Sequence, residues 1–162
     1  MKEDIAKITP DLPNAASTVE GIVTGGQPTA EHFERLAAEG YRTVIDLRTE
    51  HEDRGLSGGL DEEQVVKEAG MEYVSLPLAA RAEDFVDEAF DSFRQVLSDP
   101  ASRPVLVHCR TATRVEPLML AYLVLDEGRD LEEAERLVEE IAFRKQELHE
   151  RALEYIRARS AG

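Results

Sequence analysis

Cys109 and Arg114 are the residues of this sequence whose types and spacing most clearly indicate chemistry. Cys109 is the single cysteine of the chain, and Arg114 follows it after the four residues 110–113. A thiolate is a strong nucleophile, and a guanidinium offers a planar fork to two oxygens of a tetrahedral anion. The pair therefore predicts attack by sulfur on an oxyanion that the arginine holds.

The residues around this pair indicate a strand, a short polar loop and a helix. The apolar run 104–108 does not alternate with polar residues, which is typical of a strand buried on both faces. Arg114 then opens a helical pattern. Backbone N–H groups of such a loop can surround an anion, and the positive end of the helix dipole points at the same place. The predicted anion-binding residues are Arg110, Thr111, Ala112, Thr113 and Arg114.

Each of these residues also has a purely structural interpretation. A lone cysteine at a strand end is most often inert filling, which is the alternative for Cys109. His108 either hydrogen-bonds inside the sheet or orders the loop and the thiolate, and we do not expect it to act as a general base. Arg110 faces either solvent or substrate. The hydroxyls of Thr111 and Thr113 are expected to satisfy loop backbone groups.

The other apolar patterns predict the elements that position this loop. Short β-rich runs bounded by glycine, proline or charge predict strands at residues 19–24, 43–47, 71–76 and 105–108. Helical patterns fall at residues 29–39, 62–69, 85–97 and 131–142, in addition to the helix after the loop. This alternation predicts an α/β fold with a central, mostly parallel sheet of four to five strands flanked by helices. Ligands of such sheets bind beyond the carboxyl ends of the strands, where Cys109 lies.

Length and charge limit the possible partners. A length of 162 residues fits one domain, 1–162, with a loose N-terminal segment over 1–18. The formal charge of -15 opposes binding to nucleic acid and to anionic lipid. Neither a secretory signal core nor an apolar run long enough to span a membrane is apparent. With a single cysteine, the simplest location is the reducing cytoplasm.

The charge run over 132–151 is expected to have no role in function. Charged pairs four residues apart over 132–151 predict a solvated helix face. Glu116 lies close to the predicted anion site in sequence, and we expect its side chain to point away to solvent.

Longer stretches of the sequence resemble a known family. VLVHCRTATR at 105–114, followed by AYLVLDEGRDLEEAERLVEE at 121–140, is similar to the cysteine-dependent protein tyrosine and dual-specificity phosphatases. The resemblance is closest to the bacterial beta-lactamase-hydrolase-like phosphatase domains. Three further segments extend it over most of the chain: GGQP at 25–28, GYRTVIDLR at 40–48 and AGMEYVSLPL at 69–78.

The resemblance implies a protein tyrosine phosphatase-like fold and the hydrolysis of phosphomonoesters such as phosphotyrosine. It implies that Cys109 attacks phosphorus to form a phosphocysteine and that Arg114 binds the phosphoryl oxygens. The implied partner is a phosphorylated protein or small molecule, and neither a metal nor another cofactor is needed. The acidic residues around His51 are accordingly interpreted as solvated surface.

Three departures from the family pattern keep two alternatives open. Most tyrosine phosphatases have five residues between cysteine and arginine, whereas the four found here are shared with rhodanese sulfurtransferases and with the bacterial family named above. The first alternative is therefore a rhodanese-like sulfurtransferase that works through a Cys109 persulfide. In addition, Ala112 replaces the usual loop glycine, and Val115 stands where a hydroxyl residue is expected. The second alternative is accordingly a pseudophosphatase that binds phosphate without turning it over.

The resemblance also requires a general acid that protonates the leaving oxygen. In the family this is an aspartate on a loop corresponding to 79–84, which makes Asp84 the first candidate and Glu83 the next. Both could instead stabilise the start of the following helix.

Asp46 is a further candidate for the acid because it ends a predicted strand near the same crevice. It could instead hold loop backbone or Arg48. Arg48 and Arg81 either recruit a second phosphate or pair with carboxylates.

Overall fold

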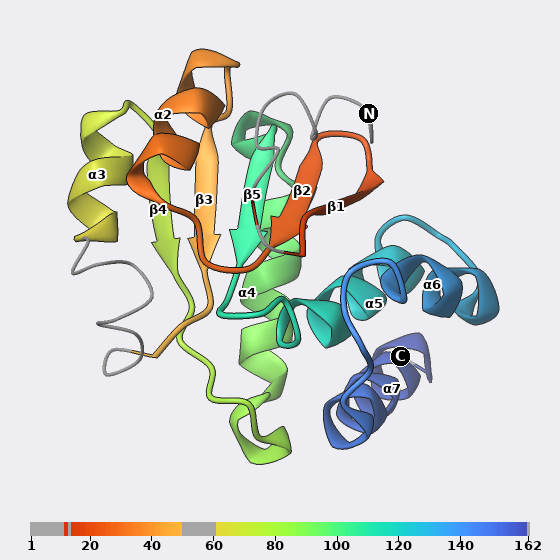
Figure 1. The fold of residues 1–162 in the computed structure, drawn as a ribbon. Coiled ribbons are helices and arrows are strands. Elements are labelled where there is room, and N and C mark those ends of the chain that lie inside the picture. The colour runs from red at the N-terminus through yellow and green to blue at the C-terminus, as the bar shows by residue number, and fades with distance from the viewer. Residues whose placement is uncertain (1–11, 13, 50–60, 162) are drawn as a thin grey trace.

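The structure is a computed structural model that describes residues 12, 14–49 and 61–161 (Figure 1). His51 and its acidic neighbours lie outside these residues.

A five-stranded sheet forms the centre of the molecule. In chain order its strands are β1 (Ala16–Val19), β2 (Ile22–Gly25), β3 (Thr43–Asp46), β4 (Glu72–Ser75) and β5 (Val105–His108). The strand order across the sheet is β1-β2-β5-β3-β4. β1 is antiparallel to β2, and every other pair is parallel. The structure therefore confirms the predicted mostly parallel sheet.

The first predicted strand is divided in the structure. In place of one strand over 19–24, β1 and β2 form a hairpin that turns at Glu20 and Gly21. Gly21 has a φ of 85°, a backbone conformation that favours glycine. β1 also begins at Ala16, inside the segment 1–18 that was expected to be loose. The additional strand lies at one edge of the sheet.

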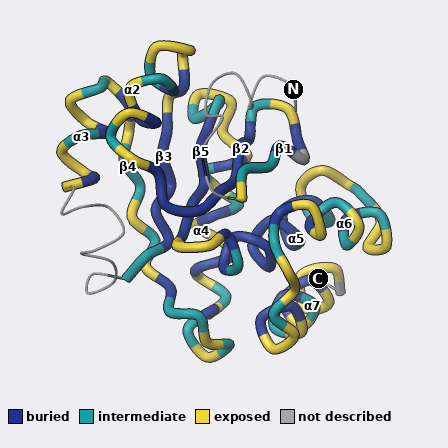
Figure 2. The backbone as a smooth tube through the Cα atoms, in the orientation of Figure 1, coloured by how far each residue is buried: buried dark blue, intermediate teal, exposed yellow. Residues whose placement is uncertain are grey.

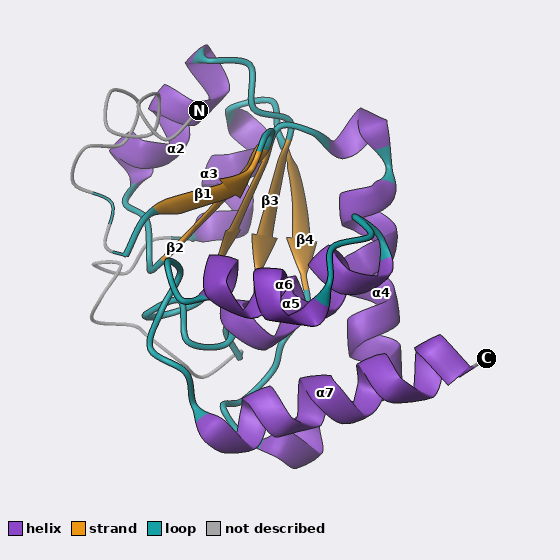
Figure 3. Cartoon of the chain, turned by 90° about the vertical axis from the view of Figure 1, so that its right-hand side faces the viewer, coloured by secondary structure: helices purple, strands orange, loops and turns teal. Residues whose placement is uncertain are grey.

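Helices cover both faces of the sheet (Figures 1 and 3). Side chains of α2 (Ala30–Ala38) and α3 (Glu62–Glu68) form an apolar cluster with Leu106 of β5. The opposite face packs Val105 and Val107 against α4 (Asp87–Ser98) and α5 (Val115–Leu125). β5 is thus buried on both faces, as its unbroken apolar run predicts.

The helix α5 lies in the centre of the second layer. All of its residues from Val115 to Leu123 are buried, and the tube in Figure 2 shows the helix almost entirely in the colour of buried residues. α6 (Leu131–Val138) and α7 (Gln146–Ala161) pack against it on the outside. A helix that is apolar on all sides is stable only when neighbours enclose it in this way. No helix among the residues described combines the length and the apolar character needed to cross a membrane.

The predicted helix over 131–142 is shorter in the structure. α6 ends at Val138, and residues 139–145 run to α7 without helical structure. The side chain of Ile141 is buried in this connection, and Lys145 donates a hydrogen bond to the carbonyl oxygen of Ala80 at 2.7 Å. These long-range contacts replace helical hydrogen bonds that the local pattern favours.

Strand register brings the ends of three strands to one level. Gly25 of β2 and Asp46 of β3 are both the pairing partners of His108, the last residue of β5. Because the three strands are parallel, the segments that follow them meet at the same edge of the sheet. Cys109 follows His108 at this edge.

Candidate active site

The loop between β5 (Val105–His108) and α5 (Val115–Leu125) begins with Cys109 and ends with Arg114. Cys109 directly follows β5, and its backbone N–H donates to the carbonyl oxygen of Gly25 at 3.4 Å. Ala112 has a φ of 69°, in the left-handed region where glycine is usual. The N–H of Val115 donates to the Ala112 carbonyl at 3.1 Å, which closes the turn into α5. Ala112 therefore keeps the conformation expected of a glycine, at a cost of about 1–2 kcal/mol.

Residues outside the loop donate hydrogen bonds to its backbone carbonyl groups. The backbone N–H of Gln27 donates to the Arg110 carbonyl at 3.2 Å, and Asn14 Nδ2 donates to the Thr111 carbonyl at 3.2 Å. The hydroxyls of Thr111 and Thr113 bond each other at 3.1 Å. Within the described part of the chain, no protein acceptor binds the backbone N–H groups of 110–113. These donors are the groups that an oxyanion would use.

Arg114 is turned into the protein. Its side chain is 6% exposed, and one guanidinium nitrogen donates to the Leu78 carbonyl at 2.8 Å. Arg110, in contrast, is exposed. The loop therefore combines a buried guanidinium at its helical end with an exposed one beside the cysteine.

Cys109 itself has no exposed surface and belongs to the larger apolar cluster. This burial fits the inert interpretation of the residue as well as that of a nucleophile at the base of a closed site. If Cys109 is the nucleophile, atoms of the surrounding loop must move before its sulfur can reach a phosphorus atom.

His108 is held by a carboxylate that the sequence interpretation did not include. Its Nε2 bonds Glu62 Oε2 at 2.5 Å, and its Nδ1 faces the Cys109 carbonyl oxygen at 3.3 Å. All of these side chains are buried. Burial alone would lower the pKa of His108, but the charge and hydrogen bond of Glu62 outweigh it and raise the pKa above its usual range. As an imidazolium, His108 donates to both groups and orders the backbone at the cysteine.

Arg48 connects the carboxylates of Asp46 and Glu62. Its guanidinium bonds both oxygens of Asp46, at 3.0 and 2.9 Å, and Glu62 at 2.9 Å. Tyr73 donates a further hydrogen bond to Asp46 at 2.6 Å. Burial alone would raise the pKa of Asp46, but Arg48, His108 and Tyr73 together lower it to about 2. An aspartate held in this way is an anion, which fits the structural alternative for Asp46 and Arg48 and not the role of a proton donor.

The same cluster has the composition of a metal site. Asp46, Glu62 and His108 place one ligand atom each within 4.8 Å of one another. Arg48 already supplies a cation to both carboxylates, and His108 bonds Glu62. These interactions use the same oxygen and nitrogen atoms that a metal would require. The residues therefore fit a buried salt-bridge network better than a metal centre.

The charged residues of the predicted acid loop pair with one another, and Arg114 bonds the Leu78 carbonyl just before this loop. Asp84 Oδ2 accepts a hydrogen bond from Arg81 Nε at 3.1 Å, and Glu83 is 4.0 Å from the same nitrogen. Both acidic residues lie in the short 3-10 turn Ala82–Asp84 before α4. Arg81 thus pairs with carboxylates, which is the second of the two roles considered for it from the sequence. To act as the acid, Asp84 would have to leave Arg81.

Glu116 is buried, and the expectation that it points to solvent is wrong. The residue is 1% exposed, and Oε1 bonds His149 Nδ1 of α7 at 2.7 Å. The other ring nitrogen of His149 bonds Glu135 of α6 at 2.7 Å. Burial raises the pKa of Glu116. A neutral imidazole has only one N–H and can donate to only one carboxylate. Hydrogen bonds between His149 and both Glu116 and Glu135 therefore require one additional proton. This chain of contacts joins the first turn of α5 to α6 and α7.

The sheet and the position of the loop after β5 fit the protein tyrosine phosphatase-like fold that the sequence resemblance implies. The family model described as a DSP-PTPase phosphatase fused to NAD+ kinase matches residues 10–155. The chain therefore belongs to this family, whose members are hydrolases of phosphate esters, and the resemblance noted in the sequence is confirmed.

Relatives and solved structures agree with this assignment. A beta-lactamase hydrolase-like protein of Agrobacterium fabrum is 31% identical over 111 residues, which are 68% of this chain and 24% of that protein. The chain thus spans about a quarter of the length of this curated relative. Two solved structures share the fold. A DUF442 protein of Shewanella putrefaciens CN-32 has a TM-score of 0.75 at 18% identity, with 94% of this chain and 97% of that chain covered. The catalytic domain of the PP-IP phosphatase SIW14 of S. cerevisiae has a TM-score of 0.74 at 16% identity, with 93% of each chain covered.

Proposed function

We propose that this protein hydrolyses aryl phosphomonoesters, such as phosphotyrosine, through a phosphocysteine intermediate. The observation that carries the proposal is the loop 110–113, whose backbone N–H groups have no protein acceptor in the described chain. This loop lies between a cysteine and a buried arginine at the carboxyl edge of the sheet. Such a set of donors suits the three equatorial oxygens of a transferring phosphoryl group.

The proposed reaction has two steps. The thiolate of Cys109 attacks phosphorus, a phosphorus–sulfur bond forms, and the bond from phosphorus to the leaving oxygen breaks. Arg114 and the loop N–H groups bind the phosphoryl oxygens throughout. Water then attacks the phosphocysteine, which releases inorganic phosphate and restores the thiolate.

The proton for the leaving oxygen comes from Asp84 in this proposal, after the carboxyl group has left Arg81. A phenolate leaving group needs little protonation, so aryl phosphates depend less on this acid than alkyl phosphates do. Asp84→Asn is therefore expected to slow the hydrolysis of an alkyl phosphate more than that of para-nitrophenyl phosphate. Equal rates for wild type and Asp84→Asn on both substrates would remove Asp84 from the mechanism.

The test of the function compares wild type with Cys109→Ser on para-nitrophenyl phosphate. A serine hydroxyl is a far weaker nucleophile, so we expect the rate to fall by about a thousandfold or more. Alkylation of Cys109 by iodoacetate, followed by mass spectrometry with and without inorganic phosphate, tests whether the buried sulfur becomes accessible. Full activity of Cys109→Ser would overturn the proposal.

Sulfur transfer is the second candidate, because rhodanese sulfurtransferases share the four-residue loop. In this reaction Cys109 takes the outer sulfur of thiosulfate to form a persulfide and releases sulfite. Cyanide then removes that sulfur as thiocyanate. Thiocyanate production that exceeds phosphate release at equal substrate concentrations would establish this function in place of the first. Phosphate binding without either turnover would indicate a pseudophosphatase.

Either reaction requires a reduced thiol at Cys109. We therefore propose a reducing compartment, such as the cytoplasm, as the place where the protein works. The proposed partner is a phosphorylated protein or small molecule that reaches the loop between β5 and α5.

A further inference from the structure

Gln27 lies between the loop that follows β5 and the buried carboxylate of Glu62, and the proposed reaction gives it no role. It comes two residues after the end of β2, at the edge of the sheet where Cys109 lies. Gln27 is only 7% exposed. Burying a polar side chain costs free energy unless hydrogen bonds compensate for it, so the contacts of this amide indicate its role.

The side-chain amide of Gln27 has one orientation that its partners allow. Its Nε2 donates to Glu62 Oε1 at 3.0 Å and to the Pro28 carbonyl at 2.9 Å. A carbonyl only accepts, and the Glu62 carboxylate, which Arg48 bonds, also accepts, so the nitrogen faces both. Gln27 Oε1 then has no hydrogen-bond partner among the described residues, although it is buried. Because a buried acceptor without a partner lowers stability, stability alone does not explain a glutamine here.

Gln27 also closes a ring of hydrogen bonds behind the loop. Its backbone N–H donates to the Arg110 carbonyl at 3.2 Å, while its side chain holds Glu62. Glu62 in turn bonds His108, whose Nδ1 faces the Cys109 carbonyl. Gln27 therefore connects the backbone of the loop to the carboxylate that orients His108.

The contacts of the carbonyl groups determine where the N–H groups of the loop point. In a planar trans peptide, a carbonyl and the N–H of the next residue point in opposite directions. The Cys109 carbonyl faces His108, so the N–H of Arg110 points away from the histidine. The Arg110 carbonyl bonds the Gln27 N–H, so the N–H of Thr111 points away from Gln27. Both N–H groups belong to the set that has no protein acceptor in the described chain.

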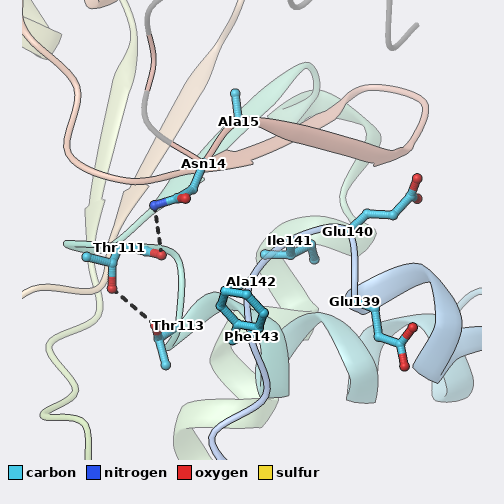
Figure 4. Close-up of a pocket in the computed structure, with 9 residues that line it drawn as sticks. All are labelled: Asn14, Ala15, Thr111, Thr113, Glu139, Glu140, Ile141, Ala142 and Phe143. Atoms are coloured by element: carbon cyan, nitrogen blue, oxygen red, sulfur yellow. Dashed lines mark hydrogen bonds between the residues drawn. The ribbon is translucent and has the colours of Figure 1, made fainter.

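The next peptide of the loop is held by a side chain in the same way. Asn14 Nδ2 donates to the Thr111 carbonyl, as the upper dashed line in Figure 4 shows. The N–H of Ala112 accordingly points away from Asn14. Three consecutive peptides are thus oriented by groups outside the loop. Donors that are oriented before an anion arrives need no rearrangement when it binds, which strengthens their effect on a reacting group.

We propose that Gln27 is a positioning residue for the proposed phosphatase reaction. Its side chain fixes its own backbone N–H against the Arg110 carbonyl, which directs the N–H of Thr111 at the phosphoryl group. It also keeps Glu62 on His108, which acts in the same way on the N–H of Arg110. Gln27 itself does not touch the phosphoryl oxygens. This inference rests on the proposed phosphatase function and adds a residue that prepares its anion site.

Gln27→Met tests the proposal, because methionine is of similar length but donates no hydrogen bond. We expect the inhibition constant of inorganic phosphate to rise, and kcat/KM for para-nitrophenyl phosphate to fall, each by about three- to tenfold. Gln64→Met is the matched control. Gln64 is exposed on α3 and also donates to a glutamate, Glu68, at 3.0 Å, but neither residue belongs to the ring. Equal effects of both variants, or a lower kcat/KM with an unchanged inhibition constant, would overturn the proposal.

Gln27→Glu keeps the shape of the side chain but replaces the donor with an acceptor that faces Glu62. It should therefore lose more kcat/KM than Gln27→Met, and a smaller loss would contradict the role of Nε2. All rates are measured at a temperature below the unfolding transition of each variant, so that they report on folded protein.

The backbone amide signals of Arg110 and Thr111 in NMR spectra give a readout that a loss of stability would not move. Added inorganic phosphate should shift both proton signals downfield in wild type, because both groups donate to the anion. The shift of the Thr111 signal at saturation should be smaller in Gln27→Met. The same shift in both proteins would exclude Gln27 from orienting this donor.

Calorimetric titration with inorganic phosphate separates this inference from the phosphatase proposal. If wild type hydrolyses para-nitrophenyl phosphate but Gln27→Met changes neither phosphate affinity nor the amide signals, the inference fails and the phosphatase stands. If wild type hydrolyses no phosphate ester but binds phosphate with an affinity that depends on Gln27 and not on Gln64, the phosphatase fails. In that case the role of Gln27 in preparing an anion site stands.

Discussion

At the scale of single residues, the imidazole of His108 is the group that connects Cys109 to the interior. Glu62 fixes one ring nitrogen and thereby directs the other at the Cys109 carbonyl. Because Glu62 also raises the pKa of His108, it keeps a positive charge directly behind the cysteine. In the proposed reaction, Glu62 would therefore act as a positioning residue, whose effect passes through His108.

Glu62→Gln removes the negative charge and keeps a side chain of similar size. We expect the pKa of His108 to fall, because the charge and the hydrogen bond of Glu62 are what raise it. A pH titration of the His108 ring signals by NMR should therefore show its midpoint at lower pH in this variant. Glu63→Gln is the matched control, because Glu63 is exposed and pairs only with Lys67 among the described residues. The same midpoint in wild type and Glu62→Gln would contradict this role.

The low pKa of Asp46 predicts that the free energy of unfolding falls in acid. Its pKa is about 2 in the folded protein and 3.8 without its partners, so the unfolded chain binds the proton more tightly. The stabilisation is therefore present above pH 3.8 and is lost as the pH falls towards 2, by about 2 kcal/mol in all. Urea unfolding at a series of pH values should show a smaller decrease for Asp46→Asn than for wild type. Glu34→Gln, an exposed change on α2, should leave the slope as it is.

At the scale of elements, α5 depends on contacts from the two helices that follow it. Glu116 in its first turn and Glu135 of α6 bond the two ring nitrogens of His149 on α7. The loop that carries Arg114 leads directly into this turn. The contact among α5, α6 and α7 therefore fixes the first turn of α5 and, with it, the position of Arg114 at the end of the loop.

His149→Ala leaves the buried carboxyl of Glu116 without its imidazole partner. We expect unfolding free energy to fall by about 3 kcal/mol, as is usual when one member of a buried pair is removed. Adding Glu116→Gln to this variant removes the isolated acidic group, so the double variant should be more stable than His149→Ala alone. Urea denaturation of the four proteins in the cycle measures this coupling. A double variant that is less stable than His149→Ala would contradict the assignment.

The limits of sequence interpretation follow from the range of these contacts. The strand, loop and helix around Cys109 were predictable because their signals are local. The partners of His108 and His149 lie 46 and 33 residues away in sequence, so no pattern near either histidine marks Glu62 or Glu116. Residues 139–142 continued a helical pattern, but contacts of Ile141 and Lys145 with distant segments end the helix early.

At the scale of the whole molecule, charge opposes the approach of a phosphorylated substrate. The formal charge is -15, and the cations of the candidate site act only at short range. Added sodium chloride screens the long-range repulsion more than the short contacts inside the loop between β5 and α5. We therefore expect kcat/KM for para-nitrophenyl phosphate to rise, by about twofold, between low and physiological ionic strength. A steady fall over this range would show that the local positive field dominates instead.

The enclosure of α5 has a consequence for where the chain tolerates substitution. Because the helix that follows the loop is buried on every side from Val115 to Leu123, a new side chain there disturbs the packing of both neighbouring helices. Residues 139–145 connect α6 to α7 and belong to neither β5 nor α5. Substitutions at the exposed positions of this connection are therefore expected to cost less stability than substitutions in α5.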